Sequence, residues 1–212
     1  MIQESRTTEQ VADVSQGIDT WENVSVLEAL VAGQERAIAA VRSVIPTIAS
    51  AADILAMRLA AGGRLVYAGA GTSIRIAVQD GSELPATFGM VENKIVYLIA
   101  GGKSAMFETL ADAEDDILAG QRDAAQLLPA DTLIAVAASG RTPYTIAVAE
   151  SAKVNGTFVI SVVNNHGTVL GALDNIEIVL DTGAEVIAGW HSPEGCTKFA
   201  INTYPYSPWC GA

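Results

Sequence analysis

The sequence has few residues of the kinds that bind metals or form disulfides. Its 212 residues include two cysteines, Cys196 and Cys210, and two histidines, His166 and His191. The cysteines both lie in the last segment and the histidines are widely spaced, so we expect neither a disulfide framework nor a metal-ligand cluster. The sequence therefore predicts chemistry that requires no metal and no redox cofactor.

Basic residues and long apolar runs are scarce as well. Twelve Lys and Arg stand against 24 Asp and Glu, which gives a formal net charge of −12. Because nucleic-acid binding depends on clustered positive charge, this composition argues against a nucleic-acid partner. No apolar run reaches the ~20 residues that span a bilayer, and the start MIQESRTTEQ lacks the basic and apolar parts of a secretory signal. We expect no membrane partner and a cytoplasmic location.

The order of apolar and polar residues predicts an α/β fold. Two helices with a break near Pro46 are expected before the first strand. Strands and helices then alternate, which implies parallel pairing with helices on both faces of the sheet. We predict a three-layer αβα sandwich with a five-stranded parallel sheet, preceded by N-terminal helices. The predicted strands are 64–69, 95–100, 132–138, 157–163 and 176–180, and the helical patterns between them lie near 74–80, 104–128 and 142–154.

A chain of this length fits one structural domain. Within it we distinguish an N-terminal helical region (1–61), a core (62–189) and an atypical C-terminal segment (190–212).

The first predicted strand leads directly into a loop of glycines and hydroxyl residues. Gly69 and Gly71 permit a tight turn, while Thr72 and Ser73 supply hydroxyls at the start of the next helix. Unpaired backbone N–H groups and the helix dipole favour an anion at such a place. Taken alone, the pattern is explained equally well by a plain strand-to-helix connection.

The same arrangement follows the predicted strand 132–138. Ser139, Gly140 and Thr142 come after the apolar run, and Pro143 suits the first helical position with Thr142 as N-cap. Loops at the carboxyl ends of strands in one parallel sheet converge where such sheets bind ligands. The two loops together predict a site for a phosphorylated small molecule.

Two carboxylates and two arginines lie near these loops in the sequence. Glu83 stands beside apolar residues shortly after the first loop, which favours an altered environment for its carboxyl group. Glu114 opens an acidic run within the 104–128 pattern, where a solvated helix face is the simpler interpretation. Arg75 and Arg141 either pair with a phosphate or form structural ion pairs, and neither is assigned a catalytic role.

Four motifs, taken in order, resemble a known family: GAGTS at 69–73, SELP at 82–85, AEDD at 113–116 and ASGRTPY at 138–144. From about Thr8 to Gly189 the chain is similar to the sugar isomerase (SIS) domain, and specifically to the N-acetylmuramic acid 6-phosphate etherase family. The resemblance implies a homodimer to which the N-terminal helices contribute, and it allows the partner to complete the active site. It also implies that Glu83 is the catalytic acid, that Glu114 is the base, and that phosphate is bound by Gly71, Thr72, Ser73, Ser139, Gly140 and Thr142.

By this resemblance the chain is a lyase acting on a phosphorylated amino sugar. It would cleave the D-lactyl ether of N-acetylmuramic acid 6-phosphate to N-acetylglucosamine 6-phosphate and D-lactate, by elimination followed by hydration. Two other functions remain open. A sugar-phosphate-binding regulator needs the loops but no catalysis, and an aldose–ketose isomerase shares the phosphate site and the removal of a proton from C2.

The sequence departs from the family pattern at two places. Ile74 replaces a usual glycine, and a β-branched side chain there is expected to narrow the approach of phosphate. From Trp190 onward, WHSPEGC stands where the family has a loop rich in serine, threonine and arginine, and the ending YPYSPWCGA carries two prolines that cannot continue a helix. Two interpretations are open: a divergent C-terminus or a local change of reading frame.

Overall fold

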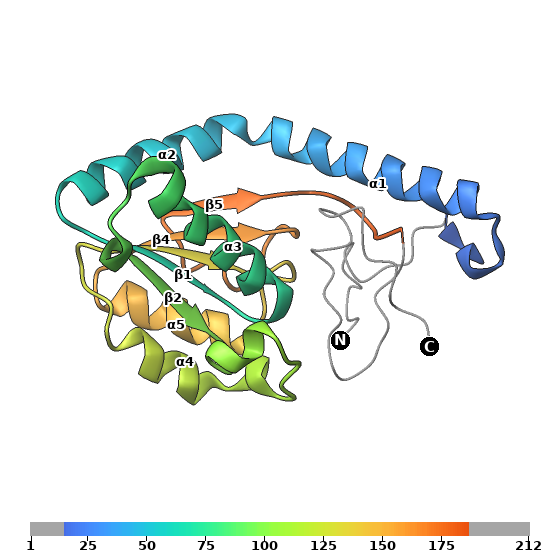
Figure 1. Cartoon of the computed structure of the whole chain (residues 1–212). Helices are drawn as coiled ribbons and strands as arrows, with labels where there is room; N and C mark the ends of the chain where they lie inside the picture. Colours follow the sequence, from blue (N-terminus) through green and yellow to red (C-terminus); the bar gives the residue numbers. More distant parts are fainter. Residues whose placement is uncertain (1–14, 187–212) are drawn as a thin grey trace.

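Five parallel strands form the centre of the computed structural model, which describes residues 15–186 (Figure 1). The predicted strand positions agree with the structure to within two residues. Each strand is short and rich in β-branched or other apolar residues, as expected for a sheet covered on both faces. In chain order the strands are β1 Leu65–Gly69, β2 Ile95–Ile99, β3 Thr132–Val136, β4 Phe158–Val163 and β5 Ile176–Val179.

The strand order across the sheet is β2-β1-β3-β4-β5. The chain therefore passes from β1 to β2 on one side and then returns to place β3 on the other side of β1. The carboxyl ends of β1 and β3 are neighbours, because Gly69 pairs in register with Val136. A point where the order reverses in this way leaves a crevice between the two following loops.

Helices cover both faces of the sheet, which confirms the predicted three-layer αβα architecture (Figure 1). Helices α1 and α2 precede the first strand and break at Val44, next to Pro46, as predicted. Figure 1 shows α1 extending well beyond the sheet. The helices are α1 Asn23–Ser43, α2 Ile45–Ala60, α3 Gly71–Phe88, α4 Ile117–Ala124 and α5 Pro143–Val154, with short 3-10 turns η3 Ile18–Thr20, η4 Glu92–Lys94, η5 Lys103–Met106 and η6 Ala113–Asp115.

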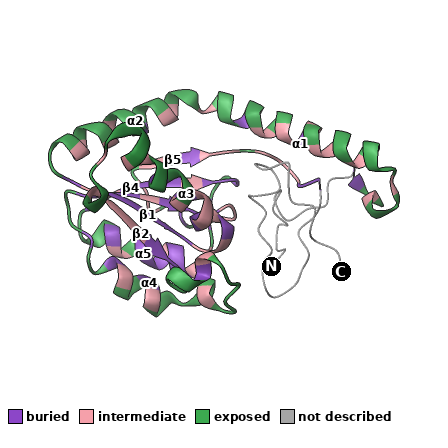
Figure 2. Ribbon diagram, viewed as in Figure 1, coloured by how far each residue is buried: buried purple, intermediate pink, exposed green. Residues whose placement is uncertain are grey.

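Alternate residues of each strand enter different cores. On β1, Val66 and Ala68 pack with α4 and α5, whereas Leu65 and Tyr67 pack with α3. Helix α2 covers β4 and β5 on the α3 side, through a cluster that includes Ala51. Strands β1, β3 and β4 are mostly buried and β2 and β5 are partly buried, whereas much of α1 is exposed (Figure 2). Both faces of the sheet are thus covered, so we expect a functional site at its edges and loops.

Two helical patterns differ from the prediction. Helix α3 continues from Gly71 to Phe88 with Pro85 inside it, so it is much longer than 74–80. The 104–128 pattern is not one helix, since it divides into η5, an irregular stretch, η6 and α4. Asp112 has a positive φ of 61°, which stops a helix, and the Asp116 side chain caps α4 by accepting a 2.8 Å hydrogen bond from the Ala119 amide.

Among the described helices, no single one is long and apolar enough to cross a membrane. Helices α1 and α2 meet that criterion only when taken together, and they are bent by 61° at their junction.

Candidate functional site

The two hydroxyl loops lie side by side at the switch point between β1 and β3. The paired strands run about 4.8 Å apart, so the segments that leave Gly69 and Val136 start next to each other. Each segment opens a helix, α3 after β1 and α5 after β3. The expectation that both loops meet at one edge of the sheet is confirmed, and two helix N-termini point to that edge.

In the first loop, Ala70 is the N-cap and Gly71, with φ 54°, opens α3. Gly69 allows the strand end to lie directly against β3, because a Cβ at this position would be 2.9 Å from the Val136 carbonyl oxygen. Thr72 is buried and Ser73 is half-buried. The Ser73 hydroxyl and the first-turn N–H groups are therefore the donors best placed for an anion.

Ile74 follows this loop as a core residue of α3. Its side chain is 1% exposed and packs in the core with Leu65, Ala77 and Val136. The expected narrowing of the phosphate approach stays a prediction.

The second loop turns tightly at Gly140, which has a φ of 64°. The Ser139 hydroxyl accepts a 3.2 Å hydrogen bond from the Arg141 amide. Thr142 and Pro143 occupy the N-cap and first helical positions as predicted, although the Thr142 side chain does not cap the helix. Pro143 contributes no N–H, so the donors at this helix end are the hydroxyls and the amides that follow.

A segment after β4 supports the second loop. The carbonyl oxygen of Ala138 accepts hydrogen bonds from the Asn164 amide (2.9 Å) and from Nδ2 of Asn165 (3.0 Å). The Leu170 amide donates to the Gly140 carbonyl oxygen at 3.1 Å. Sequence analysis did not identify these residues. The Asn-Asn pair directly after a predicted strand was the available signal.

Glu114 lies in η6, in the connection between β2 and α4, and not in the middle of a helix. This turn packs against α5, and its Ala113 lies against Gly101 at the end of β2. The Glu114 side chain is exposed, but partial burial and the nearby Asp115 raise the pKa of its carboxyl group. Glu114 is therefore positioned beside the helix that carries the second loop.

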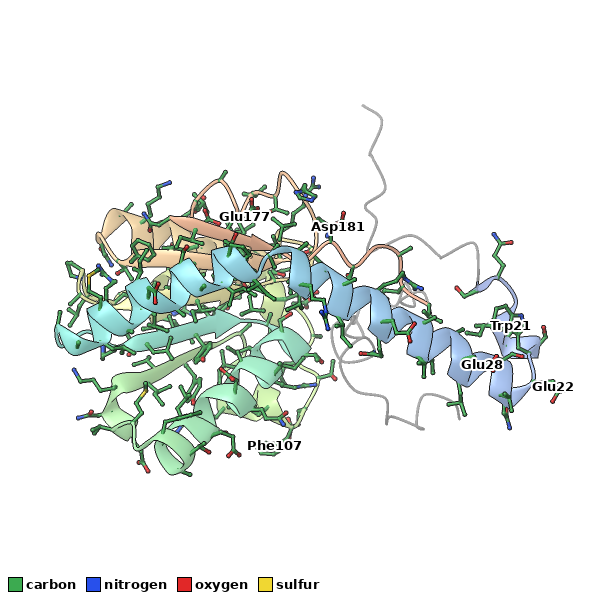
Figure 3. All side chains as sticks on the ribbon, turned by 90° about the horizontal axis from the view of Figure 1, so that it is seen from above. Trp21, Glu22, Glu28, Phe107, Glu177 and Asp181 are labelled. Atoms are coloured by element: carbon green, nitrogen blue, oxygen red, sulfur yellow. The ribbon has the colours of Figure 1, made fainter. Side chains whose placement is uncertain are left out.

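Arg75 holds the start of the same connection. Its guanidinium donates to the carbonyl oxygens of Ala105 (2.7 and 3.0 Å) and Glu108 (2.9 Å). Arg75 thus binds backbone carbonyl groups, and its pairing with a phosphate stays a prediction. Phe107, within the segment it holds, is 93% exposed and projects from the body (Figure 3).

Glu83 lies elsewhere in the single chain. Helix α3 runs back along the sheet, since Ile74 contacts Gly69 at the carboxyl end of β1 while Gly81 contacts Tyr67 farther back. Twelve residues of helix separate Glu83 from Gly71, which is about 18 Å along the axis. Glu83 is also exposed in the single chain, and the altered environment expected from its apolar neighbours stays a prediction. Within one chain, α3 therefore carries Glu83 away from the loop that the helix follows.

Within residues 15–186, no group of three or more His, Cys, Asp or Glu side chains is arranged to hold a metal ion.

Comparison with known proteins agrees with this fold. Residues 47–153, half of the chain, match the family model described as "Glucokinase regulatory protein N-terminal SIS domain". The chain belongs to this SIS-domain family. The match contains both hydroxyl loops, Glu83 and Glu114.

Two similar curated proteins share the name N-acetylmuramic acid 6-phosphate etherase. The chain is 41% identical over 202 residues to the N-acetylmuramic acid 6-phosphate etherase of Deinococcus radiodurans, with 93% of this chain and 66% of the relative covered. It is 43% identical over 172 residues to the protein of the same name from Symbiobacterium thermophilum, with 79% of this chain and 57% of the relative covered. The chain thus spans between 57% and 66% of the length of these relatives.

A solved structure shares the fold. The phosphoheptose isomerase from Francisella tularensis superposes with a TM-score of 0.60 at 19% identity, with 76% of this chain and 86% of that chain covered. The positions expected to deviate at residues 190–212 lie outside the described residues.

Proposed function

We propose that this SIS-domain protein is a carbon–oxygen lyase that cleaves the D-lactyl ether of N-acetylmuramic acid 6-phosphate to N-acetylglucosamine 6-phosphate and D-lactate. The observation that carries the proposal is the 41% identity to an etherase over 93% of the chain, an extent that includes both loops and both glutamates. The reaction would serve the catabolism of amino sugars from peptidoglycan in the cytoplasm.

The two loops would bind the 6-phosphate. Hydroxyls of Ser73, Ser139 and Thr142 surround the switch point, and the N-termini of α3 and α5 add N–H donors and favourable dipoles. Local donors of this kind suit a chain of net charge −12, whose overall field repels an anion. Phosphate binding far from the reacting bond would position C2 and C3 of the sugar for proton transfer.

Glu114 would act as the base. In the open-chain sugar the C1 aldehyde acidifies the C2 proton, and Glu114 removes it while the C3–O bond breaks. The raised pKa of Glu114, caused by burial and by Asp115, makes it a better proton acceptor near neutral pH. Glu83 would protonate the departing ether oxygen, and water would then add to C3.

The acid would come from a second copy of the chain. Glu83 lies about 18 Å along α3 from the loop that α3 opens, so it cannot reach the substrate bound there. A homodimer resolves this if α3 of the partner places its Glu83 over the Glu114 connection, which stands uncovered with Phe107 exposed. Each site would then combine loops and base from one chain with the acid from the other.

Release of D-lactate from purified protein and N-acetylmuramic acid 6-phosphate tests the activity. We expect Glu83→Gln and Glu114→Gln each to lower kcat by about 10²- to 10⁴-fold, the usual contribution of a general acid or base. Lactate release that persists in both variants contradicts the assigned roles. Sugar-phosphate binding without lactate release identifies the regulator instead, and conversion of an aldose phosphate to a ketose phosphate identifies the isomerase.

Mixing the two inactive variants tests the shared site. In a mixed dimer, one site combines an intact Glu114 with the intact Glu83 of the other chain. After unfolding and refolding an equal mixture, half of the dimers are mixed and half of their sites are intact, so about a quarter of wild-type activity should return. If both acids act within one chain, no mixture recovers activity.

A further inference from the structure

We infer that Tyr67 and Asp80 form a clamp that sets the position of Glu83 on α3. The Tyr67 hydroxyl on β1 donates to Oδ2 of Asp80 on α3 at 2.6 Å. Asp80 precedes Glu83 by three residues, so the two carboxylates occupy adjacent places on one stripe of the helix. The inference rests on the proposed role of Glu83 and adds two residues that act through it.

The hydrogen bond is of the strong kind. Tyr67 is 6% exposed, and burial together with the Asp80 carboxylate raises the pKa of its phenol, so the hydroxyl stays protonated as a donor at all ordinary pH values. A hydrogen bond from a neutral hydroxyl to an ionised carboxylate is shorter and roughly twice as strong as one between neutral groups. It therefore holds α3 against rotation about its own axis.

A close contact also fixes the distance between this turn of α3 and the sheet. Tyr67 stacks on Tyr97 of β2, with ring centroids 6.0 Å apart and planes inclined by 11°. Gly81 lies directly on this pair, because a Cβ there would be 2.6 Å from the Tyr97 hydroxyl oxygen and 2.9 Å from a Tyr67 ring carbon. Gly81, which follows Asp80 and precedes Glu83 by two residues, thus packs on the two rings.

The rotation of α3 about its axis and its distance from the sheet are thus both fixed about one turn before Glu83, the proposed acid. The Glu83 side chain itself is exposed in the single chain. A proton donor that must meet an ether oxygen bound by another chain depends on such support, since a misplacement of about 1 Å can cost about 10²-fold in rate. Tyr67 and Asp80 are accordingly positioning residues.

Tyr67→Phe tests the clamp, with Tyr97→Phe as a matched control that removes the neighbouring hydroxyl and leaves the Asp80 bond intact. We expect Tyr67→Phe to lower kcat for lactate release by about 10- to 100-fold with KM changed by less than about twofold. Tyr97→Phe should retain the wild-type kcat. Equal kcat values in the two variants overturn the inference.

Asp80 supplies the second half of the test. Asp80→Asn keeps an oxygen that accepts from Tyr67 and should retain most of kcat, whereas Asp80→Ala should match Tyr67→Phe. The double variant Tyr67→Phe/Asp80→Ala should lose no more than either single variant, because both remove the same bond. Additive losses contradict a shared role.

Hydrogen exchange separates this inference from the proposed function. Amides 79–88 should exchange faster in Tyr67→Phe than in Tyr97→Phe, while the strands keep their protection. If the wild-type protein releases no lactate, the proposed function fails, and exchange alone decides on the clamp. Equal exchange in the two variants, or loss of protection throughout the fold, refutes it.

Discussion

At the scale of single residues, Asp131 shows how a buried charge can stabilise this fold. Its side chain is 1% exposed and accepts hydrogen bonds from Arg64 Nη2 (2.6 Å), Arg64 Nε (3.0 Å) and the Leu128 amide (2.9 Å). Burial by itself raises the pKa of Asp131, but the bonds from Arg64 and Leu128 outweigh it and bring that pKa below its ordinary value. The ionised form is thus the one that the folded chain prefers.

Asp131→Asn should lower the free energy of unfolding by about 3 kcal/mol at pH 7, because it leaves the Arg64 charge without its partner. Urea denaturation measures the loss. Asp116→Asn is the control, since its pair with Arg122 is exposed and 3.9 Å long, and asparagine keeps the cap of α4. A change of less than about 0.5 kcal/mol is expected there, and equal losses in the two variants contradict the argument.

The same pair predicts a pH dependence. Since the folded-state pKa of Asp131 is lowered, its contribution is fully present above the pKa of an unfolded aspartate, about 3.9. It is lost as the pH falls through the lowered pKa. The difference in unfolding free energy between wild type and Asp131→Asn should therefore shrink as the pH falls below about 4. A difference that stays constant down to acid unfolding shows that the Asp131 charge is not the cause.

At the scale of elements, the loop after β3 depends on one glycine. Gly140 has a φ of 64°, and a Cβ there would be 2.3 Å from the Thr168 Cβ. Thr168 is buried and accepts a 3.0 Å hydrogen bond from the Gly171 amide, so it has little room to move. The loop after β3 therefore packs tightly against the β4–β5 connection.

Gly140→Ala should cost at least about 2 kcal/mol of stability and weaken binding of inorganic phosphate, because strain and a clash act together. Gly167→Ala is a matched control: its φ is 63° and no atom lies within 4 Å of the added Cβ. It should cost about 1 kcal/mol and leave phosphate affinity unchanged. Urea denaturation and calorimetric titration provide the two measurements, and equal effects of both variants on affinity contradict the fit.

At the scale of the whole molecule, α1 carries an apolar stripe that the single chain leaves exposed. Spacings of three, four, seven and three residues along it follow the a/d pattern of a helix that packs against another helix. Such a stripe on a helix that extends beyond the sheet supports the homodimer proposed above. The stripe consists of Val24 (67% exposed), Leu27 (59%), Val31 (56%), Ile38 (57%) and Val41 (41%).

Leu27→Asp should dissociate the dimer, because it places a charge within this stripe. Light scattering at micromolar concentration measures the molecular mass. Val154→Asp, at an 87% exposed position at the end of α5, should leave the mass unchanged. If the site is shared, lactate release should fall along with dimer content. A wild-type protein that is monomeric at these concentrations rejects the dimer.

Local sequence determined the strands, the two hydroxyl loops and the break near Pro46. Short apolar runs that end in glycine and hydroxyl residues predict a strand followed by a loop, because the signal lies within a few neighbouring residues. Parallel pairing followed from alternation of strands and helices, and with it the meeting of both loops at one edge. The catalytic roles of Glu83 and Glu114 came by resemblance and remain proposals, as does the division into regions 1–61, 62–189 and 190–212.

Tertiary structure decided the rest. A positive φ at Asp112 divides the 104–128 pattern. The spacing of apolar residues does not reveal the backbone conformation of one residue. Ile74 enters the core and Arg75 binds the Ala105 and Glu108 carbonyls, because the direction of a side chain depends on what packs around it. The bond between Tyr67 and Asp80 joins a strand to a helix across 13 residues of chain. The separation of Glu83 from its own loops follows from the length of α3 and from its direction along the sheet. Both depend on how the helix packs against the sheet.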